Sequence, residues 1–126
     1  MTTEKKKPFN LQKGQMIPLI VVLFLVLVGM VAVITDGGVI MSNRRSAQAA
    51  ADAAAMAGAK RACAGYSDAI AVAEAYAANN GATAVSASRN GSRITVQVSI
   101  ENASFFSTVF GQERLDTTAS AIAGCY

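Results

Sequence analysis

The sequence predicts an α+β protein. A single N-terminal transmembrane helix extends into a long alanine-rich helix, followed by a short second helix and a small, mostly antiparallel three-stranded sheet head. Two observations predict this class. A long uncharged apolar run passes into alanine-rich sequence, and the chain then changes to alternating polar and apolar residues around an Asn-Gly pair. Because much of the apolar content of the 126 residues is alanine, we expect one small head with a thin core.

The apolar run extends from Met16 to Ile34 and contains no charged residue. A helix over this run is about 28 Å long, which matches the hydrocarbon thickness of one bilayer. Pro18 falls in its first turn, where a missing backbone N–H is tolerated. We therefore assign a transmembrane helix to residues 15–35, preceded by a basic polar leader at residues 1–14.

Basic residues are unevenly placed along the chain. Four lysines precede the apolar run: Lys5, Lys6, Lys7 and Lys13. The positive-inside rule therefore predicts a cytoplasmic N-terminus, a single pass through the cytoplasmic membrane and a C-terminal part outside it. From Gln15 onward the chain is neutral, with seven basic residues (eleven minus four) and seven acidic residues (eight minus Glu4). A neutral remainder without clustered basic and aromatic residues predicts no nucleic-acid binding.

Residues 36–64 are predicted to continue as an alanine-rich helix outside the membrane. Alanine is the best helix former, and the segment contains no proline. Asp36 is expected at the outer interface of the membrane. The Gly37-Gly38 pair leaves two interpretations open: one helix from about residue 16 to 62, or a break at the two glycines.

The stretch QAAADAAAMAGA, residues 48–59, carries small residues at four-residue spacing. Small residues at this spacing let a neighbouring helix approach closely, so we assign a helix-packing face to the stretch. The face comprises Ala50, Asp52, Ala54 and Gly58. Gln48 lies one turn from Asp52, which allows an i,i+4 pair. The alternative is that this helix packs only against its own head.

The head is expected at residues 65–126 and begins with a second helix. Gly65 ends the preceding helix, and Ser67-Asp68 offers an N-cap for the next one. The second helix is short and rich in alanine, and it is expected to stop at Asn79-Asn80-Gly81.

A hairpin and a final strand are predicted after the second helix. Asn90-Gly91 lies between two alternating runs, which indicates strands at 83–88 and 93–101 with the Ile/Val face of the second strand buried. A last strand begins near Leu115. Before it we expect a short helix whose apolar cluster forms the core of the head: Phe105, Phe106, Val109 and Phe110.

Cys63 and Cys125 are the two cysteines of the chain, and they are not in CxxC or metal-type spacing. Both lie in the part predicted outside the membrane, where oxidation is allowed. A disulfide between them would join the end of the long helix to the last strand and stabilise a small head. Two unpaired thiols are the alternative that the sequence leaves open.

Catalytic and metal-binding patterns are not found in the sequence. The chain contains no histidine, no Gly-rich phosphate loop and no carboxylates paired at helical spacing in an apolar setting. We therefore predict that the protein is not an enzyme and has no catalytic residues, no cofactor, no metal site and no small-molecule substrate.

The segment from Lys13 to Ala59 resembles the N-terminal part of the TadE/TadG-like family of the Tad (tight adherence, Flp) pilus system. That family carries a basic residue and Gly-Gln before the span, Asp-Gly at its outer end, and an alanine-rich signature after arginines. The matching residues are Lys13-Gly14-Gln15, Asp36-Gly37, Arg44-Arg45 and Gln48 to Ala59. Residues 94–123 resemble the C-terminal module of TadG-like proteins more weakly.

Gly14 and Gln15 form a candidate processing site, because prepilin peptidases cut after a basic leader that ends in glycine before an apolar helix. The typical substrate carries glutamate at the fifth position after the glycine, where this chain has Leu19. Processing after Gly14 and an uncut polar tail therefore both stay open, as does the choice between a TadE-like and a TadG-like subtype.

The resemblance implies a pilin-like layout and a function as a pilus-assembly protein or minor pilin-like subunit that acts by helix–helix packing. The implied partners are other Tad pilus or secretion components, membrane lipid, and further copies of the chain through the N-terminal helix. Incorporation in a surface filament is a further implication. The alternative function is a bitopic membrane protein whose outer domain binds a ligand or another protein and is unrelated to pili.

Overall fold

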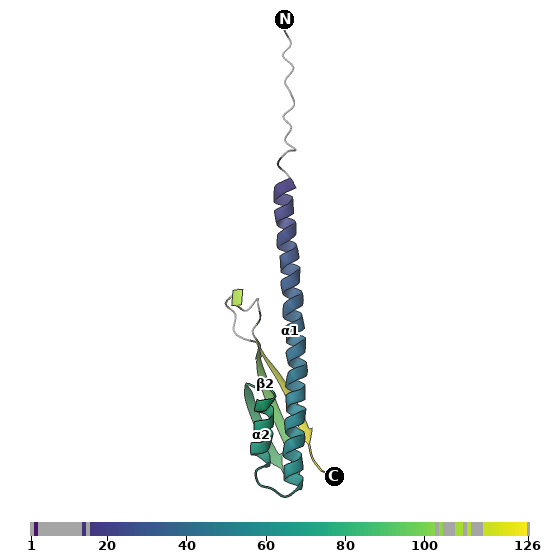
Figure 1. Ribbon diagram of the computed structural model, residues 1–126, viewed down its shortest axis with the longest axis vertical. Coiled ribbons are helices and arrows are strands. Elements are labelled where there is room, and N and C mark those ends of the chain that lie inside the picture. The colour runs from purple at the N-terminus through teal and green to yellow at the C-terminus, as the bar shows by residue number, and fades with distance from the viewer. Residues whose placement is uncertain are drawn as a thin grey trace. The chain divides into compact units, whose positions relative to one another are not determined.

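A computed structural model describes residues 2, 14, 16–102, 104, 108–109, 111 and 115–125. The chain divides into two compact units, Met1–Ile34 and Thr35–Tyr126, and each is described here by itself. Two helices and three strands have defined bounds, which confirms the predicted α+β class (Figure 1). In chain order they are α1 (Met16–Cys63), α2 (Ala69–Asn79), β1 (Ala84–Asn90), β2 (Arg93–Asn102) and β3 (Leu115–Ala123).

The long helix α1 is uninterrupted and runs through Gly37 and Gly38. The single-helix interpretation is therefore confirmed, and the structure shows no break at the two glycines. A glycine in a helix interior costs about 1 kcal/mol relative to alanine. Several turns of apolar or alanine-rich sequence flank the pair on both sides, and helix propagation through such residues outweighs this cost.

Glycine ends both helices by the same backbone arrangement. Gly65 has a φ of +82°, and the N–H of Tyr66 donates to the carbonyl of Arg61 at 3.1 Å. Gly81 has a φ of +89°, and the N–H of Ala82 donates to the carbonyl of Ala77 at 3.1 Å. A residue with positive φ followed by such a bond satisfies the last free carbonyls of a helix, and glycine adopts this φ without a steric penalty. The two predicted helix ends are thereby explained.

The predicted N-cap of α2 is wrong in one respect. Asp68 occupies the N-cap position, and its carbonyl accepts the first bond of the helix from the N–H of Val72 at 3.0 Å. Within the described residues its carboxylate makes no capping bond to α2. The carboxylate is instead bonded to Arg61, because the turn at Gly65 brings the last turn of α1 next to the start of α2.

The described strands form an antiparallel sheet in the order β1-β2-β3, and the predicted hairpin is confirmed. Its strands are longer than the pattern predicts, because Asn90 pairs with Arg93 and leaves Gly91 and Ser92 as the loop. Gly91 has a φ of +62°. A glycine of positive φ at the first of two loop residues is the type II′ pattern. The first loop residue is therefore the glycine, and the asparagine is the last residue of the preceding strand.

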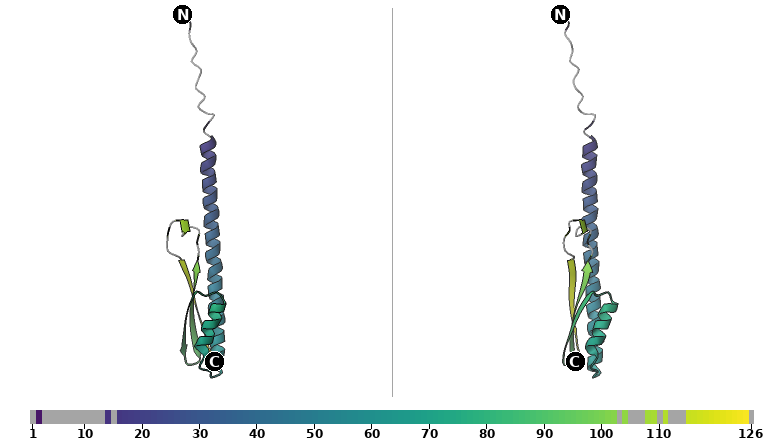
Figure 2. Two further views of the ribbon diagram at one scale, coloured as in Figure 1. Left: turned by 60° about the vertical axis from the view of Figure 1, so that its left-hand side comes forward. Right: turned by 90° about the vertical axis from the view of Figure 1, so that its left-hand side faces the viewer.

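The second unit has two layers, with α2 and the C-terminal part of α1 on one face of the sheet (Figure 2). Three side chains of β2 face the helices and are fully buried: Ile94, Val96 and Val98. They pack against buried alanines of both helices. The predicted Ile/Val face is therefore confirmed for these residues, and the core is as thin as the composition suggests.

The predicted phenylalanine core lies outside the described residues, since Phe105, Phe106 and Phe110 are not among them. Val109, the fourth member of the predicted cluster, is described and is 59% exposed. The core that the structure does show consists of alanine, isoleucine and valine.

Candidate functional site

The N-terminal part of α1 exposes apolar side chains on all sides. Leu25 is 68% exposed and Ile34 is 72% exposed, and the side chains between them are exposed to a similar extent. By length and composition this helix is able to cross a membrane. Exposed aliphatic side chains around a whole helix are unfavourable in water, because each buried CH₂ would gain about 0.8 kcal/mol. Transfer of this unit into an apolar surrounding would therefore be favourable.

The candidate processing site is described in part. Gly14 is exposed, and a Cβ added to it would have no atom within 4 Å. Gln15 lies outside the described residues. The site therefore stays a prediction from the sequence.

The small-residue face of α1 is buried inside the head. Ala50 and Ala54 have no exposed surface, and Gly58 is also buried. A Cβ added at Gly58 would lie 2.9 Å from the Cβ of Ala73 and 3.0 Å from the carbonyl oxygen of Ala69. These distances place α2 in direct backbone contact with α1, so the close helix packing that the alanines predict takes place within one chain.

This burial supports the alternative that the helix packs against its own head, and packing against a neighbouring helix stays a prediction. Gly58 faces Ala69 and Ala73 of α2 and Ile94 of β2, and Ala50 and Ala54 have no exposed surface. Asp52 is the exception, because it is exposed. It accepts a hydrogen bond from Nε2 of Gln48 at 3.0 Å, which is the i,i+4 pair expected from their spacing.

Side-chain hydrogen bonds join α1 to the end of β2 and to Ser104 beyond it, and they join that end of β2 to β3. Ser104 Oγ donates to Oδ2 of Asp36 at 2.8 Å, and both residues are buried. Asn102 is 2% exposed; it accepts from Nδ2 of Asn43 and donates to Oγ1 of Thr117. These bonds join residues up to 68 positions apart in the chain, so sequence spacing could not reveal them. The one local signal was an aspartate directly after the apolar run.

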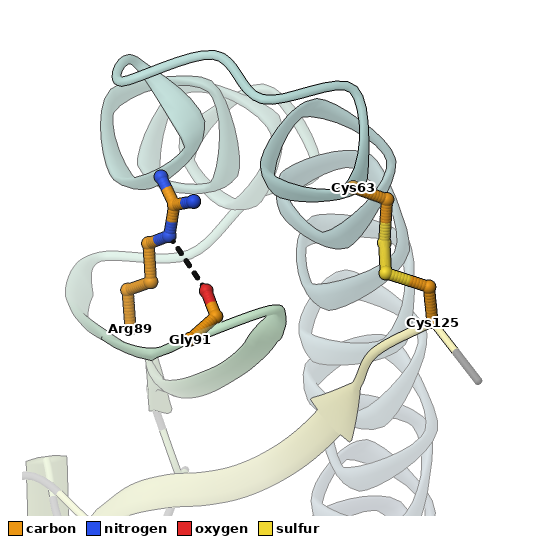
Figure 3. Close-up of a disulfide and its surroundings, with 4 residues drawn as sticks. All are labelled: Cys63, Arg89, Gly91 and Cys125. Atoms are coloured by element: carbon orange, nitrogen blue, oxygen red, sulfur yellow. Dashed lines mark hydrogen bonds between the residues drawn. A yellow bond between two sulfur atoms is a disulfide. The ribbon is translucent and has the colours of Figure 1, made fainter.

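The opposite end of the head is closed by a disulfide (Figure 3). Cys63, the last residue of α1, is bonded to Cys125, two residues beyond β3, with their Cα atoms 6.1 Å apart. The structure thus pairs the two cysteines that the sequence left either bonded or free. The bridge ties the C-terminal strand to the long helix across 62 positions of sequence.

Arginine side chains surround the α1–α2 connection at this end. The guanidinium of Arg61 is bonded to the carboxylate of Asp68 and lies 3.9 Å from the ring centroid of Tyr66. The hydrogen bond to Arg61 lowers the pKa of Asp68 and, reciprocally, raises the pKa of Arg61. Arg89 extends from the hairpin and donates from Nη1 to the carbonyl of Tyr66 at 2.9 Å and from Nε to the carbonyl of Gly91 at 2.8 Å (Figure 3). The sequence analysis missed this cluster.

No group of three or more histidine, cysteine, aspartate or glutamate side chains within the described residues is arranged to hold a metal ion. Both cysteines form the disulfide and leave no free thiol. The described part of the chain presents an exposed apolar helix and a head closed by a disulfide.

Comparison with known proteins agrees with this interpretation. Residues 14–61 match the family described as putative Flp pilus-assembly TadE/G-like. The matched range covers the apolar part of α1 and nearly all of its alanine-rich continuation. No curated protein and no solved structure matches the chain. Residues 14–61 of the chain are therefore similar to the TadE/G-like family of putative Flp pilus-assembly proteins.

Proposed function

We propose that the protein is a structural, non-enzymatic component of a Tad-type pilus machine. The observation that carries the proposal is that one helix holds both an exposed apolar segment and the family-specific alanine signature. The apolar segment would anchor the protein in the cytoplasmic membrane, with the lysine-rich leader inside and the disulfide-closed head outside. A disulfide supports this orientation, because it persists in oxidising compartments.

Contacts with other copies or other pilus proteins would then use the apolar part of α1. In unit 1 the apolar side chains are exposed, whereas Ala50, Ala54 and Gly58 are buried within the head. Membrane helices associate through close packing and small residues, and Gly29 offers such a position with no atom near it. Packing between subunits would therefore involve the membrane segment rather than the alanine signature.

Mass spectrometry of the protein from its host, combined with shearing of surface filaments, tests this proposal. A mature N-terminus at Gln15 and recovery in the sheared filaments would identify a processed minor pilin. An intact leader and retention in the membrane fraction would identify an anchored assembly factor. A protein that fractionates with the membrane and whose deletion leaves filament assembly unchanged would contradict the proposal and support a bitopic binding protein.

The orientation has its own test. Cysteine-reactive, membrane-impermeant labelling of a Thr2→Cys variant and of an Asn79→Cys variant reports which side each residue occupies. We expect labelling of position 79 in intact cells and of position 2 only after the membrane is opened. The reverse pattern would rule out the proposed orientation.

A further inference from the structure

We propose that the disulfide between Cys63 and Cys125 is a redox-sensitive latch that holds β3 on the head. Its reduction by a dithiol releases β3 from the sheet, while the C-terminal part of α1, α2, β1 and β2 stay folded. This inference rests on the geometry of the head alone, and it holds or fails independently of the role in a pilus.

The side chains of β3 add little apolar burial to the head. Residues that are paired across neighbouring strands lie on the same face of a sheet, so the partners of Val98, Val96 and Ile94 face the helices. These partners are alanines that are only partly buried: Ala119, Ala121 and Ala123. Ile122 lies on the opposite face and is 64% exposed. Because the free energy of apolar burial scales with the area removed from water, these side chains hold β3 weakly.

The strand is fastened near each of its ends by a contact outside its own backbone. Near its start, Oγ1 of Thr117 accepts a hydrogen bond from Nδ2 of Asn102. Beyond its end, Cys125 is bonded to Cys63, the last residue of α1 (Figure 3). A covalent cross-link removes conformations from the opened state, so the opening of β3 costs more free energy while the bridge is intact.

The core of the head joins β2 to the helices and does not depend on a large side chain of β3. Ile94 and Val96 of β2 are fully buried among alanines of both helices. The helix α2 packs against β1 and β2, and Ala73 of α2 lies against Gly58 of α1. These contacts persist when β3 leaves the sheet. We therefore expect the opening to be local rather than global.

The bridge is accessible to a reductant, since Cys63 and Cys125 are both exposed. A thiolate of the dithiol attacks one sulfur, the S–S bond breaks, and the other cysteine leaves as a thiolate that takes up a proton. The second thiol of the reagent then displaces the cysteine that was attacked. The dithiol is oxidised to a disulfide, and its two protons and two electrons convert the bridge to two thiols. Exposed disulfides are typically the labile and regulatory ones.

Hydrogen–deuterium exchange followed by mass spectrometry tests the inference on the folded full-length protein in a neutral detergent. Dithiothreitol is the dithiol, and alkylation verifies that both thiols are free after its addition. Three segments are compared before and after reduction: residues 115–123 of β3, 84–90 of β1 and 69–79 of α2. We expect exchange in β3 to accelerate about tenfold or more, and exchange in β1 and α2 to change less than about twofold.

The double variant Cys63→Ser, Cys125→Ser is the control for effects of the reductant itself. Its β3 should exchange as fast as β3 of the reduced parent, with or without dithiothreitol. The measurement on the parent starts from folded, oxidised protein, so it does not depend on the folding of this variant.

Two results on the parent would overturn the proposal. Equal acceleration of exchange in β3, β1 and α2 would show that the bridge supports the whole head and does not latch one strand. Unchanged exchange in β3, with both thiols verified as free, would show that the strand stays in the sheet without the bridge.

Discussion

Gly58 and Ala73 lie so close that a Cβ added to the glycine would be 2.9 Å from the Cβ of the alanine. Gly58 is on α1 and Ala73 on α2, and the carbonyl of Ala69 and the side chain of Ile94 stand within 3.2 Å of the same added atom. The neighbours are a methyl group and backbone, which have no flexible end to move away. The two helices therefore approach as closely as they do because residue 58 is glycine.

Gly58→Ala is accordingly expected to destabilise the head. Overpacking of a close contact costs about 1–3 kcal/mol, and the gain in helix propensity returns about 1 kcal/mol. Gly38→Ala is the matched control, because no atom lies within 4 Å of its added Cβ and only the propensity gain applies. Thermal unfolding is followed by circular dichroism. The midpoint temperature of Gly58→Ala should be lower than that of the parent protein, and that of Gly38→Ala should be equal to it or higher. The same shift in both variants would contradict close packing at residue 58.

Ala54→Leu tests the burial of the small-residue face. The sequence assigns Ala54 to a face that a neighbouring helix could approach, in which case the change would impair assembly and spare the monomer. Because Ala54 has no exposed surface, the larger side chain is now expected to destabilise the head itself by about 1–3 kcal/mol. Ala49→Leu, one position away from that face and exposed, should leave the unfolding midpoint nearly unchanged. A stable Ala54→Leu head that fails to assemble would restore the interpretation from sequence.

Removal of the disulfide is expected to weaken the head substantially. In the chain-entropy model, a bridge across 62 positions contributes about 4 kcal/mol. The double variant Cys63→Ser, Cys125→Ser should therefore unfold at a lower urea concentration than the oxidised parent. Reductant should bring the parent to the stability of the double variant and leave the variant itself unaffected. If the urea midpoint of the parent is the same with and without reductant, the disulfide does not stabilise the head.

The pair Arg61–Asp68 predicts an acid-dependent loss of stability. Its hydrogen bond lowers the pKa of Asp68 below the ordinary value of an aspartate. A group whose pKa is lower in the folded state stabilises the fold above its unfolded pKa and loses that contribution as the pH falls through the folded pKa. Asp68→Asn and Arg61→Gln should each flatten the pH dependence of the unfolding midpoint below pH 4 by a small amount, since the pair is exposed.

The double variant Asp68→Asn, Arg61→Gln provides the check on that pair. If the pH dependence arises from the bond between the two side chains, the double variant should behave like either single variant. Additive effects of the two substitutions would show that each residue acts through another group.

Local signals in the sequence predicted the elements with good accuracy. Gly65 and Gly81 ended the two helices as expected, because a positive φ is a property of single residues and glycine alone adopts it freely. The hairpin was also predicted, but its loop was centred one residue early. The ladder continues through Asn90↔Arg93, and pairing across strands, which depends on both strands together, moved the turn to Gly91 and Ser92.

Side chains with two available partners were harder to predict. Asp68 was expected to cap α2, and it bonds Arg61 instead, because the turn at Gly65 sets the guanidinium within 3.0 Å of it. Asn102, with partners on α1 and β3, gave no local signal at all. In both cases the deciding partner is brought close by the path of the chain rather than by sequence spacing.

The sequence by itself determined that this protein has an apolar segment long enough to cross a membrane, an alanine-rich helix, a hairpin and the signature of the TadE/TadG-like family. These properties depend on hydropathy, helix propensity and glycine geometry, which act within a few residues. The tertiary structure decided which surfaces are used and which remain free. It placed α2 directly against Gly58, joined Cys63 to Cys125, and brought Arg89 of the hairpin to the carbonyl of Tyr66. Packing and charge placement depend on which distant residues meet, and only the folded chain establishes that.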